Sequence, residues 1–163
     1  MSASEIIEAF RPHDHRRCRA SARAAVEADC RARGLRLTPA RACVLEALLE
    51  THRALTAYEL LDRLRAAGLG SQPPVAYRAL DFLVANGFAH RIERLSAFVA
   101  CAHAGAEHAA AFLICRECRT VAEASLPQIG AGLAACAEAE TFAVERVVIE
   151  AEGRCASCRA AAG

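Results

Sequence analysis

Apolar residues return every three or four positions through much of the first half of the chain, a spacing typical of amphipathic helices. Local signals indicate where these helices begin. Thr38 stands before Pro39 and Thr56 stands three residues before Glu59, so each threonine oxygen can accept a free backbone N–H at a helix start. The pattern predicts helices from about Ser21 to Arg33, from Pro39 through Leu49, from Thr56 through Leu64 and from Val75 to Ala85.

Two strand-like runs follow the last of these helices, from Phe88 to Glu93 and from Ala97 to Ala102, with a link short enough for a hairpin. Helices followed by a hairpin predict a winged helix-turn-helix, in which the helix before the hairpin enters the DNA major groove. The expected wing carries Arg91 and Arg94. The side chains that we expect at DNA bases and phosphates are Tyr77, Arg78, Tyr58, Arg36 and Arg41.

The second half has a different pattern, with strand-like apolar runs on either side of one Ala-rich helix. We expect strands over residues 109–114 and 142–150, an extended stretch over 120–122, and the helix over 126–140. The fold class that follows is α+β: an N-terminal winged helix-turn-helix, then a small α/β dimerisation domain with structural zinc. Because this second unit is too thin to cover its own apolar faces, we expect a second copy of the chain to cover them.

The expected domains are a flexible N-terminal tail over 1–20, a winged-helix DNA-binding domain over 21–98 with a hinge from about residue 95, and a dimerisation and zinc-binding domain over 99–163. Charge divides the chain at almost the same place. Residues 1–94 hold 15 Arg against 11 acidic residues, a net +4, and the remainder holds 5 Arg against 8 acidic residues, a net −3. The basic half is the one suited to contact phosphate.

Composition narrows the class of protein. No apolar run approaches the roughly 20 residues that span a bilayer, so we expect no membrane partner. Nine cysteines, an odd number, without a secretory leader at the start favour reduced thiols and a cytoplasmic location. An enzyme would need an open metal position or a reactive thiol beside a base. The sequence offers no such pairing, so we expect neither catalysis nor a small-molecule substrate.

Two Cys-x-x-Cys pairs carry the strongest chemical signal, Cys115 with Cys118 and Cys155 with Cys158. Each pair presents two thiolates from a tight loop, and together they supply the soft tetrahedral ligand set of a closed zinc site. Because such a site leaves no position for a substrate, we expect it to be structural. The alternative is a redox pair, which in a thioredoxin-like protein would open a helix after a strand.

A more dispersed set of donors spans both halves and consists of His90, Cys101, His108 and Glu123. Nitrogen, sulfur and oxygen donors of this kind suit four-coordinate zinc. A metal held there would clamp the DNA-reading unit against the second unit, whereas the alternative is surface histidines and a core cysteine. A further group in the expected tail, His13, His15 and Cys18, is interpreted as a solvated segment rather than a metal site.

Several of these motifs occur together in one known family. They are the Leu-Thr-Pro-Ala-Arg run at 37–41, the Pro-Pro-Val-Ala-Tyr-Arg-Ala-Leu-Asp-Phe-Leu run at 73–83, Cys101, both Cys-x-x-Cys pairs, and the Val-Ile-Glu-Ala-Glu-Gly-Arg-Cys-Ala-Ser-Cys run at 148–158. Over roughly residues 22–158 the chain resembles the ferric uptake regulator family, and within it the zinc uptake regulator branch.

The resemblance implies a function and a metal content. It implies a homodimeric repressor that binds operator DNA ahead of zinc-uptake genes when zinc is plentiful and releases it when zinc is scarce. It also implies two zinc ions per chain. One is a structural ion in the four-cysteine set, and the other is a regulatory ion at the hinge set, for which His103 is an alternative ligand to His108.

Departures from the family pattern affect which metal we expect the chain to bind and which DNA sequence we expect it to prefer. Iron, manganese and peroxide sensors of the family usually carry His-His-Asp-His before the first Cys-x-x-Cys, where this chain has Ala-Ala-Ala-Phe at 109–112. A Cys101 thiolate also suits zinc better than iron or manganese. Val75 stands where the family commonly has threonine, so DNA preference can differ. The alternatives left open are an iron- or peroxide-responsive regulator of the same family and a zinc-storage module that does not bind DNA.

Overall fold

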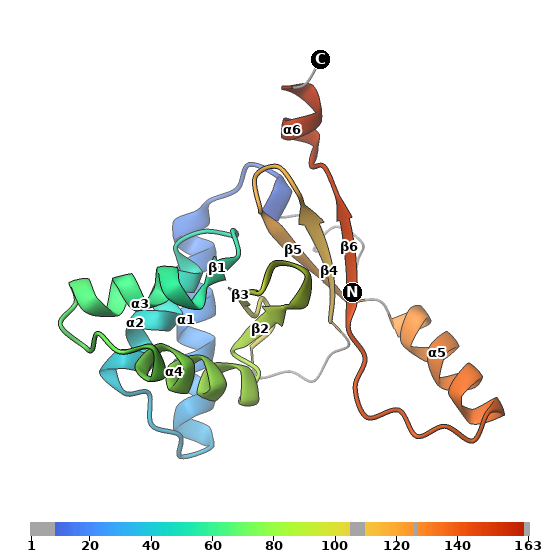
Figure 1. The fold of residues 1–163 in the computed structure, drawn as a ribbon, viewed down its shortest axis with the longest axis horizontal. Coiled ribbons are helices and arrows are strands. Elements are labelled where there is room, and N and C mark those ends of the chain that lie inside the picture. The colour runs from blue at the N-terminus through green and yellow to red at the C-terminus, as the bar shows by residue number, and fades with distance from the viewer. Residues whose placement is uncertain (1–8, 105–109, 126, 162–163) are drawn as a thin grey trace.

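Figure 1 shows the computed structural model of the chain, which describes residues 9–104, 110–125 and 127–161. The first half contains α1 (His15–Ala32), α2 (Pro39–Leu49), β1 (Leu55–Thr56), α3 (Ala57–Ala66), α4 (Pro73–Ala85), β2 (Ala89–Ile92), the 3₁₀ turn η2 (Glu93–Leu95) and β3 (Ala97–Ala100). The second half contains β4 (Ala110–Cys115), β5 (Val121–Ser125), α5 (Pro127–Ala139), β6 (Ile149–Gly153) and α6 (Ala156–Ala160). The predicted α+β class, with a winged helix-turn-helix first, is confirmed. Within these described segments, no helix is long and apolar enough to cross a membrane.

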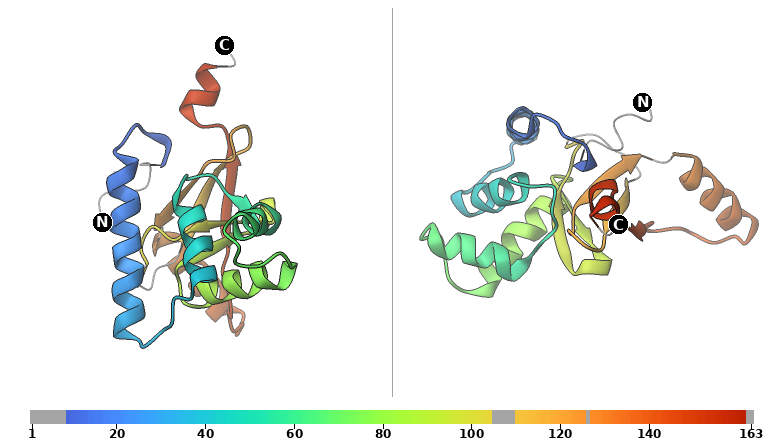
Figure 2. Two further views of the ribbon diagram at one scale, coloured as in Figure 1. Left: turned by 90° about the vertical axis from the view of Figure 1, so that its left-hand side faces the viewer. Right: turned by 90° about the horizontal axis from the view of Figure 1, so that it is seen from above.

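The helices of the first half pack around one apolar core. Figure 2 shows how these helices are arranged. Leu45, Leu60, Leu80 and Phe88 come from four different places in the chain, and each is at most 1% exposed. The small antiparallel sheet in the order β1-β3-β2 closes one side of this core. Helix α4 therefore stands directly before the β2–β3 hairpin, which is the wing that the sequence predicts.

The threonines at two helix starts behave differently. Thr56 and Glu59 form the predicted capping box: Thr56 Oγ1 accepts the Glu59 N–H at 3.3 Å, and Glu59 Oε2 accepts the Thr56 N–H at 2.7 Å. Thr38 also precedes its helix, but its side chain makes no capping hydrogen bond. Pro39 at the first helical position therefore marks the start of α2 without help from a threonine oxygen.

Helix α1 begins earlier than the sequence pattern indicates. Composition places its start at about Ser21, whereas the helix begins at His15. The reason is Asp14, whose carboxylate accepts the backbone N–H groups of Arg16 and Arg17 at 3.1 and 3.3 Å. The polar stretch just before Ser21 is therefore helical, where an unstructured tail was expected.

The second half is a thin sheet in which β4 lies between antiparallel β5 and parallel β6. Helix α5 projects away from this sheet (Figure 1), and none of the side chains described after Ala124 is buried. The strand predicted over 142–150 is wrong for most of its length, since the observed strand runs Ile149–Gly153 and residues 142–148 have no regular structure. These residues have strand composition but no strand beside them in the described chain.

The two halves meet through the wing. Backbone hydrogen bonds join the loop after α2 to β5 and the turn before it: Val121 N–H donates to the His52 carbonyl at 2.9 Å, and Ala54 N–H donates to the Arg119 carbonyl at 3.2 Å. A small apolar cluster fills the space beneath these bonds and contains Ala54, Ile92, Ala97, Val99, Phe112, Ile114 and Val121. The second sheet therefore shares its buried residues with the wing.

Candidate metal centres and nucleic-acid interface

The two Cys-x-x-Cys pairs lie together at one end of the second sheet. Parallel strands β4 and β6 end side by side, with Cys115 opposite Gly153, so the turns that follow them meet. The Arg116 N–H donates to the Gly153 carbonyl at 2.9 Å and holds these turns together. The sulfur atoms of all four predicted ligands lie within 4.8 Å of one another: Cys115, Cys118, Cys155 and Cys158.

The electrostatics of this set suit a cation. Burial raises the pKa of the Cys115 thiol, but backbone N–H groups of Cys118, Cys155 and Glu117 donate to its sulfur, and the net effect lowers its pKa to about 6. A hydrogen bond with Cys155, burial and the other two thiols raise the pKa of Cys158 to about 12. Thiols this close compete for negative charge, and a divalent cation among them would stabilise all four as thiolates. The donor set fits a closed structural zinc site.

Three of the four dispersed donors meet at the junction of the two halves. His90 comes from β2, Cys101 directly follows β3, and Glu123 comes from β5, with one ligand atom of each within 4.8 Å of the others. Glu123 Oε1 lies 3.3 Å from His90 Nε2 and 3.9 Å from Cys101 Sγ. The second carboxylate oxygen of Glu123 accepts the Ala102 N–H at 2.8 Å. This junction cluster (His90, Cys101 and Glu123) thus combines wing and second sheet.

Burial makes the junction cluster a favourable place for a cation. Cys101 is 2% exposed, and the side chain of Glu123 is 4% exposed. Burial, together with the neighbouring carboxylate of Glu123, raises the pKa of the Cys101 thiol to about 12. A buried carboxylate beside a buried thiol is energetically unfavourable unless a cation neutralises the charge. Imidazole, thiolate and carboxylate are all zinc ligands, so the residues fit zinc.

The fourth ligand of the junction cluster stays a prediction, because His108 lies outside the described residues. The alternative, His103, is described. Its Nδ1 lies 3.9 Å from Glu123 Oε1, and its backbone N–H donates to Cys101 Sγ at 3.4 Å. His103 is therefore at the edge of the cluster, and the choice between the two histidines stays open.

The side chains expected at DNA lie on α3, on α4 and around the start of α2. Arg41 is half-buried: its guanidinium stacks over the Phe82 ring at 3.6 Å and donates to a backbone carbonyl at 2.6 Å. This cation–π contact fastens α2 to α4, a packing role that the sequence pattern does not indicate. The other four side chains are exposed: Tyr58 at 71%, Tyr77 at 47%, Arg36 and Arg78.

The tip of the wing is bound to the second sheet. The Glu150 carboxylate of β6 accepts the backbone N–H groups of Glu93 and Arg94 at 2.6 and 2.9 Å. The Arg94 guanidinium pairs with Glu152 at 3.1 Å. Arg94 does lie on the hairpin as predicted, but its charge is directed at β6 rather than at an exposed DNA-facing surface.

Comparison with known proteins identifies the family. Residues 32–152 match the model of the ferric uptake regulator family. The zinc uptake regulation protein of Escherichia coli (strain K12) is 39% identical over 137 residues, which cover 83% of this chain and 80% of that protein. The chain belongs to the ferric uptake regulator family. A zinc uptake regulator solved in complex with zinc and DNA superposes with a TM-score of 0.82 at 36% identity, covering 93% of this chain and 99% of that chain.

XcZur has been solved in holo and apo forms, and this chain superposes on the two to different extents. The holo form gives a TM-score of 0.77 at 43% identity and covers 87% of this chain and 99% of that chain. The apo form gives a TM-score of only 0.52 at 44% identity and covers 88% of this chain and 99% of that chain. Because identity and coverage barely differ between the two forms, the difference in TM-score comes from conformation. This member of the family is closer to the holo arrangement.

Proposed function

We propose that this chain is a zinc-responsive transcriptional repressor that acts as a homodimer in the cytoplasm. It binds operator DNA when zinc occupies the junction cluster, and so controls zinc-uptake genes. Two zinc ions per chain are part of the proposal: a structural ion in the four-cysteine set, and a regulatory ion held by His90, Cys101, Glu123 and either His108 or His103. The proposal includes no catalytic reaction and no small-molecule substrate.

The observation that carries this proposal is the origin of the junction ligands. His90 and Cys101 belong to the wing of the DNA-reading half, and Glu123 belongs to the sheet of the second half. A zinc ion bound to all three would hold the halves at a fixed angle. In a dimer, the separation of the two α4 helices depends on that angle, and helices in successive major grooves must match the helical repeat of DNA.

Thermodynamic linkage gives the expected size of the effect. If zinc binds the DNA-competent arrangement more tightly than other arrangements, it must raise DNA affinity by the same factor. Coupling free energies between sites are typically about 1–3 kcal/mol, which corresponds to about 5- to 150-fold in affinity. The likeness to a zinc uptake regulator complexed with zinc and DNA, and to the holo form of XcZur, supports this assignment.

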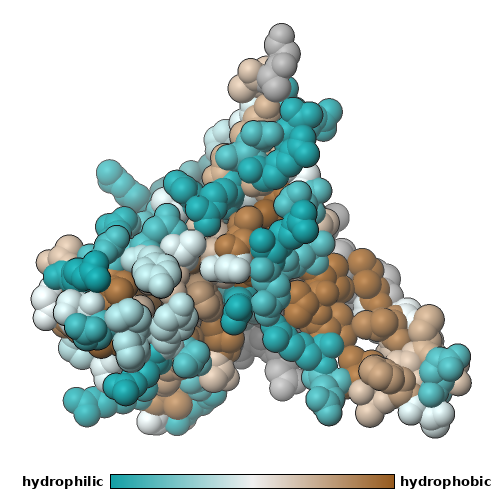
Figure 3. Space-filling view, viewed as in Figure 1, coloured by the Kyte–Doolittle hydropathy of each residue, from teal (hydrophilic) through white to brown (hydrophobic). Residues whose placement is uncertain are grey.

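The exposed apolar surface of the second half supports the homodimer. Figure 3 shows hydrophobic atoms gathered around α5, away from the core of the first half. A contiguous apolar surface marks a protein interface, and two copies related by a twofold axis would pair this surface with itself. The side chains concerned lie on α5 and in the segment after it: Ile129, Leu133, Phe142, Val144, Val147 and Val148.

The proposed DNA surface is the exposed side of the first half. Tyr77 and Arg78 stand near the start of α4, where a recognition helix contacts base edges and phosphates. The proposal also assigns to this surface Tyr58 on α3, and Arg36 and Arg41, which flank the start of α2 at Thr38 and Pro39. Because the contacts include phosphates neutralised by arginine, affinity should fall steeply as salt concentration rises.

Fluorescence anisotropy tests this function, with a duplex selected from a random-sequence library in the presence of zinc as the probe. Removal of the junction zinc by a chelator should weaken binding about 5- to 150-fold with the circular dichroism unchanged. Arg78→Ala should weaken duplex binding when zinc is present. It should also reduce the slope of log affinity against log salt concentration by about one, as expected for the loss of one phosphate contact. Arg159→Ala, an exposed arginine on α6, is the matched control and should change neither.

The alternatives predict other results. A folded, metal-stripped dimer that binds the duplex as tightly as the zinc-loaded form would contradict the zinc switch. Absence of duplex binding under all metal conditions would instead support the zinc-storage module. Duplex affinity that depends on added Fe²⁺ or on peroxide, and not on zinc, would support an iron- or peroxide-responsive regulator.

A further inference from the structure

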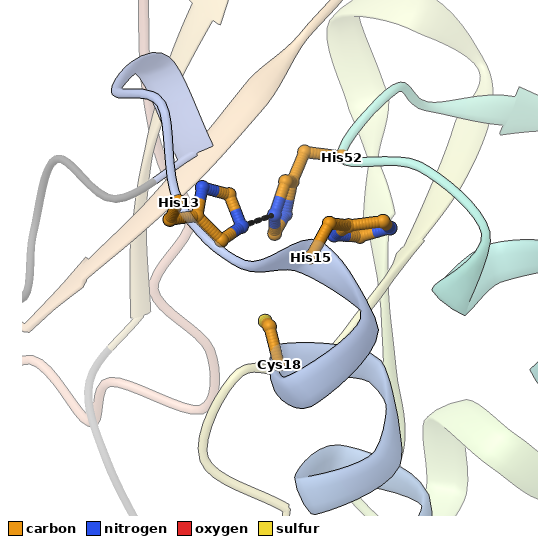
Figure 4. A group of neighbouring side chains, drawn as sticks. All are labelled: His13, His15, Cys18 and His52. Atoms are coloured by element: carbon orange, nitrogen blue, oxygen red, sulfur yellow. Dashed lines mark hydrogen bonds between the residues drawn. The ribbon is translucent and has the colours of Figure 1, made fainter.

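We propose that His13, His15, Cys18 and His52 form a third zinc site, which ties the start of α1 to the loop between α2 and β1. One ligand atom from each of these residues lies within 4.8 Å of the others. Figure 4 shows the three imidazole rings and the Cys18 side chain gathered around one point between helix and loop. This site lies outside both clusters described above, and the proposal does not depend on the regulatory function.

Hydrogen bonds on the outer side of two rings leave the correct nitrogens for a metal. His13 Nδ1 lies 2.9 Å from the Arg11 carbonyl, and His15 Nε2 lies 2.7 Å from the Glu50 carbonyl. A carbonyl can only accept, so both of these nitrogens carry hydrogen. The lone pairs are therefore on His13 Nε2 and His15 Nδ1. Metal-binding histidines are typically oriented in this way, by a carbonyl or carboxylate that accepts from the opposite ring nitrogen.

Two further observations point into the same space. His15 Nδ1 is buried and has no hydrogen-bond partner among the described residues, although it holds a lone pair. His13 Nε2 lies 3.0 Å from His52 Nε2, the hydrogen bond drawn as a dashed line in Figure 4. A buried polar atom normally has a hydrogen-bond partner or a ligand, and a cation at this point would satisfy this nitrogen together with its neighbours.

The third ring and the thiol complete the donor set. The ring centroids of His13, His15 and His52 lie 4.9–5.7 Å apart. Burial, together with the two neighbouring rings, lowers the pKa of His52 to about 4, so this imidazole is neutral and has a lone pair at neutral pH. Cys18 stands three residues after His15 on α1, which places both side chains on one face of the helix.

The chemistry of the set selects zinc. Three imidazole nitrogens and one thiolate suit zinc, and the thiolate is less suited to the harder ions Mg²⁺, Ca²⁺ and Mn²⁺. A tetrahedron with bond lengths of about 2.0–2.3 Å has edges of about 3.3–3.8 Å. The observed limit of 4.8 Å is therefore within a small side-chain adjustment of that geometry.

A shared cavity and a backbone hydrogen bond connect the third site to the junction cluster. A cavity of about 410 Å³ is lined by His15, Cys18 and His52 on one side and by Cys101, His103 and Glu123 on the other. The His52 carbonyl accepts the N–H of Val121, two residues before Glu123 on β5. Zinc at the third site would thus brace the loop to which the second sheet is hydrogen-bonded, and would fix α1 against it.

Metal analysis of the purified dimer tests the site directly. The zinc-loaded protein should hold one zinc per chain more in its natural form than in the Cys18→Ala or His13→Ala variant. Cys136→Ser, a change at an exposed thiol on α5, is the matched control and should lose none. Circular dichroism shows whether each variant remains folded. Both positions are partly exposed, and if one variant does not fold, the other still tests the site. Equal zinc content in the natural protein and both folded variants would overturn the proposal.

Cobalt substitution separates this site from the junction cluster. In a Cys101→Ser background with zinc kept in the four-cysteine set, added Co²⁺ should give a thiolate-to-cobalt charge-transfer band from Cys18. This band should disappear when Cys18→Ala is added, and the strong d–d absorption of tetrahedral Co²⁺ should weaken in His52→Gln. No thiolate band in the Cys101→Ser protein, or a band unchanged by Cys18→Ala, would also overturn the proposal.

Discussion

The two halves of the chain are stabilised by different means. The first half surrounds a continuous apolar core, and its helix α3 begins at the capping box of Thr56 and Glu59. The second half shares its buried apolar residues with the wing, and none of its described side chains after Ala124 is buried. The first half therefore depends on hydrocarbon burial, whereas in our proposal the second depends on zinc in the four-cysteine set and on a second copy of the chain. The junction cluster takes its residues from both of these differently stabilised units.

The largest effect should come from removal of one ligand of the four-cysteine set. Cys115→Ser should release zinc whose binding contributes on the order of 10 kcal/mol to folding, and the β4–β6 end of the sheet should lose its order. The first half should keep its helices. Circular dichroism, zinc content and sedimentation of the variant measure this, with Cys136→Ser as control. A variant that remains a stable dimer with unchanged thermal unfolding would show that the second half does not need its metal.

The next largest effect should come from the junction. Cys101→Ser should leave both halves folded and dimeric but remove the zinc dependence of duplex binding, a loss of about 5- to 150-fold. Anisotropy titrations with and without zinc measure it. Cys43→Ser, at a partly buried thiol on α2 that belongs to none of the three clusters, is the control. Zinc dependence that survives in Cys101→Ser would mean that the halves are coupled by something other than this cluster.

Proton release should accompany zinc binding at the junction. Burial and Glu123 raise the pKa of the Cys101 thiol to about 12, so near neutral pH the thiol carries a proton that zinc must displace. Higher pH therefore favours zinc, by about tenfold in affinity per pH unit for each proton released. Chelator-competition titrations between pH 7 and 8 measure the slope, which should decrease by one proton in Cys101→Ala. An identical slope in both proteins would place the released proton elsewhere.

The smallest effect should come from a helix cap in the first half. Thr56→Ala removes the capping box of α3 and should lower the free energy of unfolding by about 0.5–2 kcal/mol. Thr38→Ala is the matched control, because Thr38 caps α2 without a side-chain hydrogen bond and should cost less. Urea denaturation of the zinc-loaded proteins compares them. Equal losses would mean that the capping bond does not stabilise α3.

Sequence reasoning succeeded where the signal is local. The Thr56–Glu59 box, the wing after α4 and the paired cysteines each depend on residues close together in the chain or on a fixed ligand spacing. It failed for residues 142–148, because strand composition indicates an apolar surface but not whether another strand lies beside it. It also placed the start of α1 too late, since Asp14 acts through two hydrogen bonds that composition does not reveal.

Contacts between distant residues were the least predictable. His52 gives no signal in the sequence, and only the fold brings it to within 3.0 Å of the His13 ring. The stacking of Arg41 on Phe82 and the pairing of Arg94 with Glu152 are of the same kind. In each case a polar residue that the sequence places at the surface makes a contact with a distant element. Such a contact can be predicted only when the packing of the two elements is known.

The parallel pairing of β4 with β6 affects how the protein is made. Cys115 and Cys118 leave the ribosome first, and the whole crossover through α5 must be translated before Cys155 and Cys158 follow. With only two sulfurs available before β6 is made, an ion bound there would remain exchangeable. If the four-cysteine set holds the proposed structural zinc, secure loading of that ion would therefore wait until β6 has paired with β4.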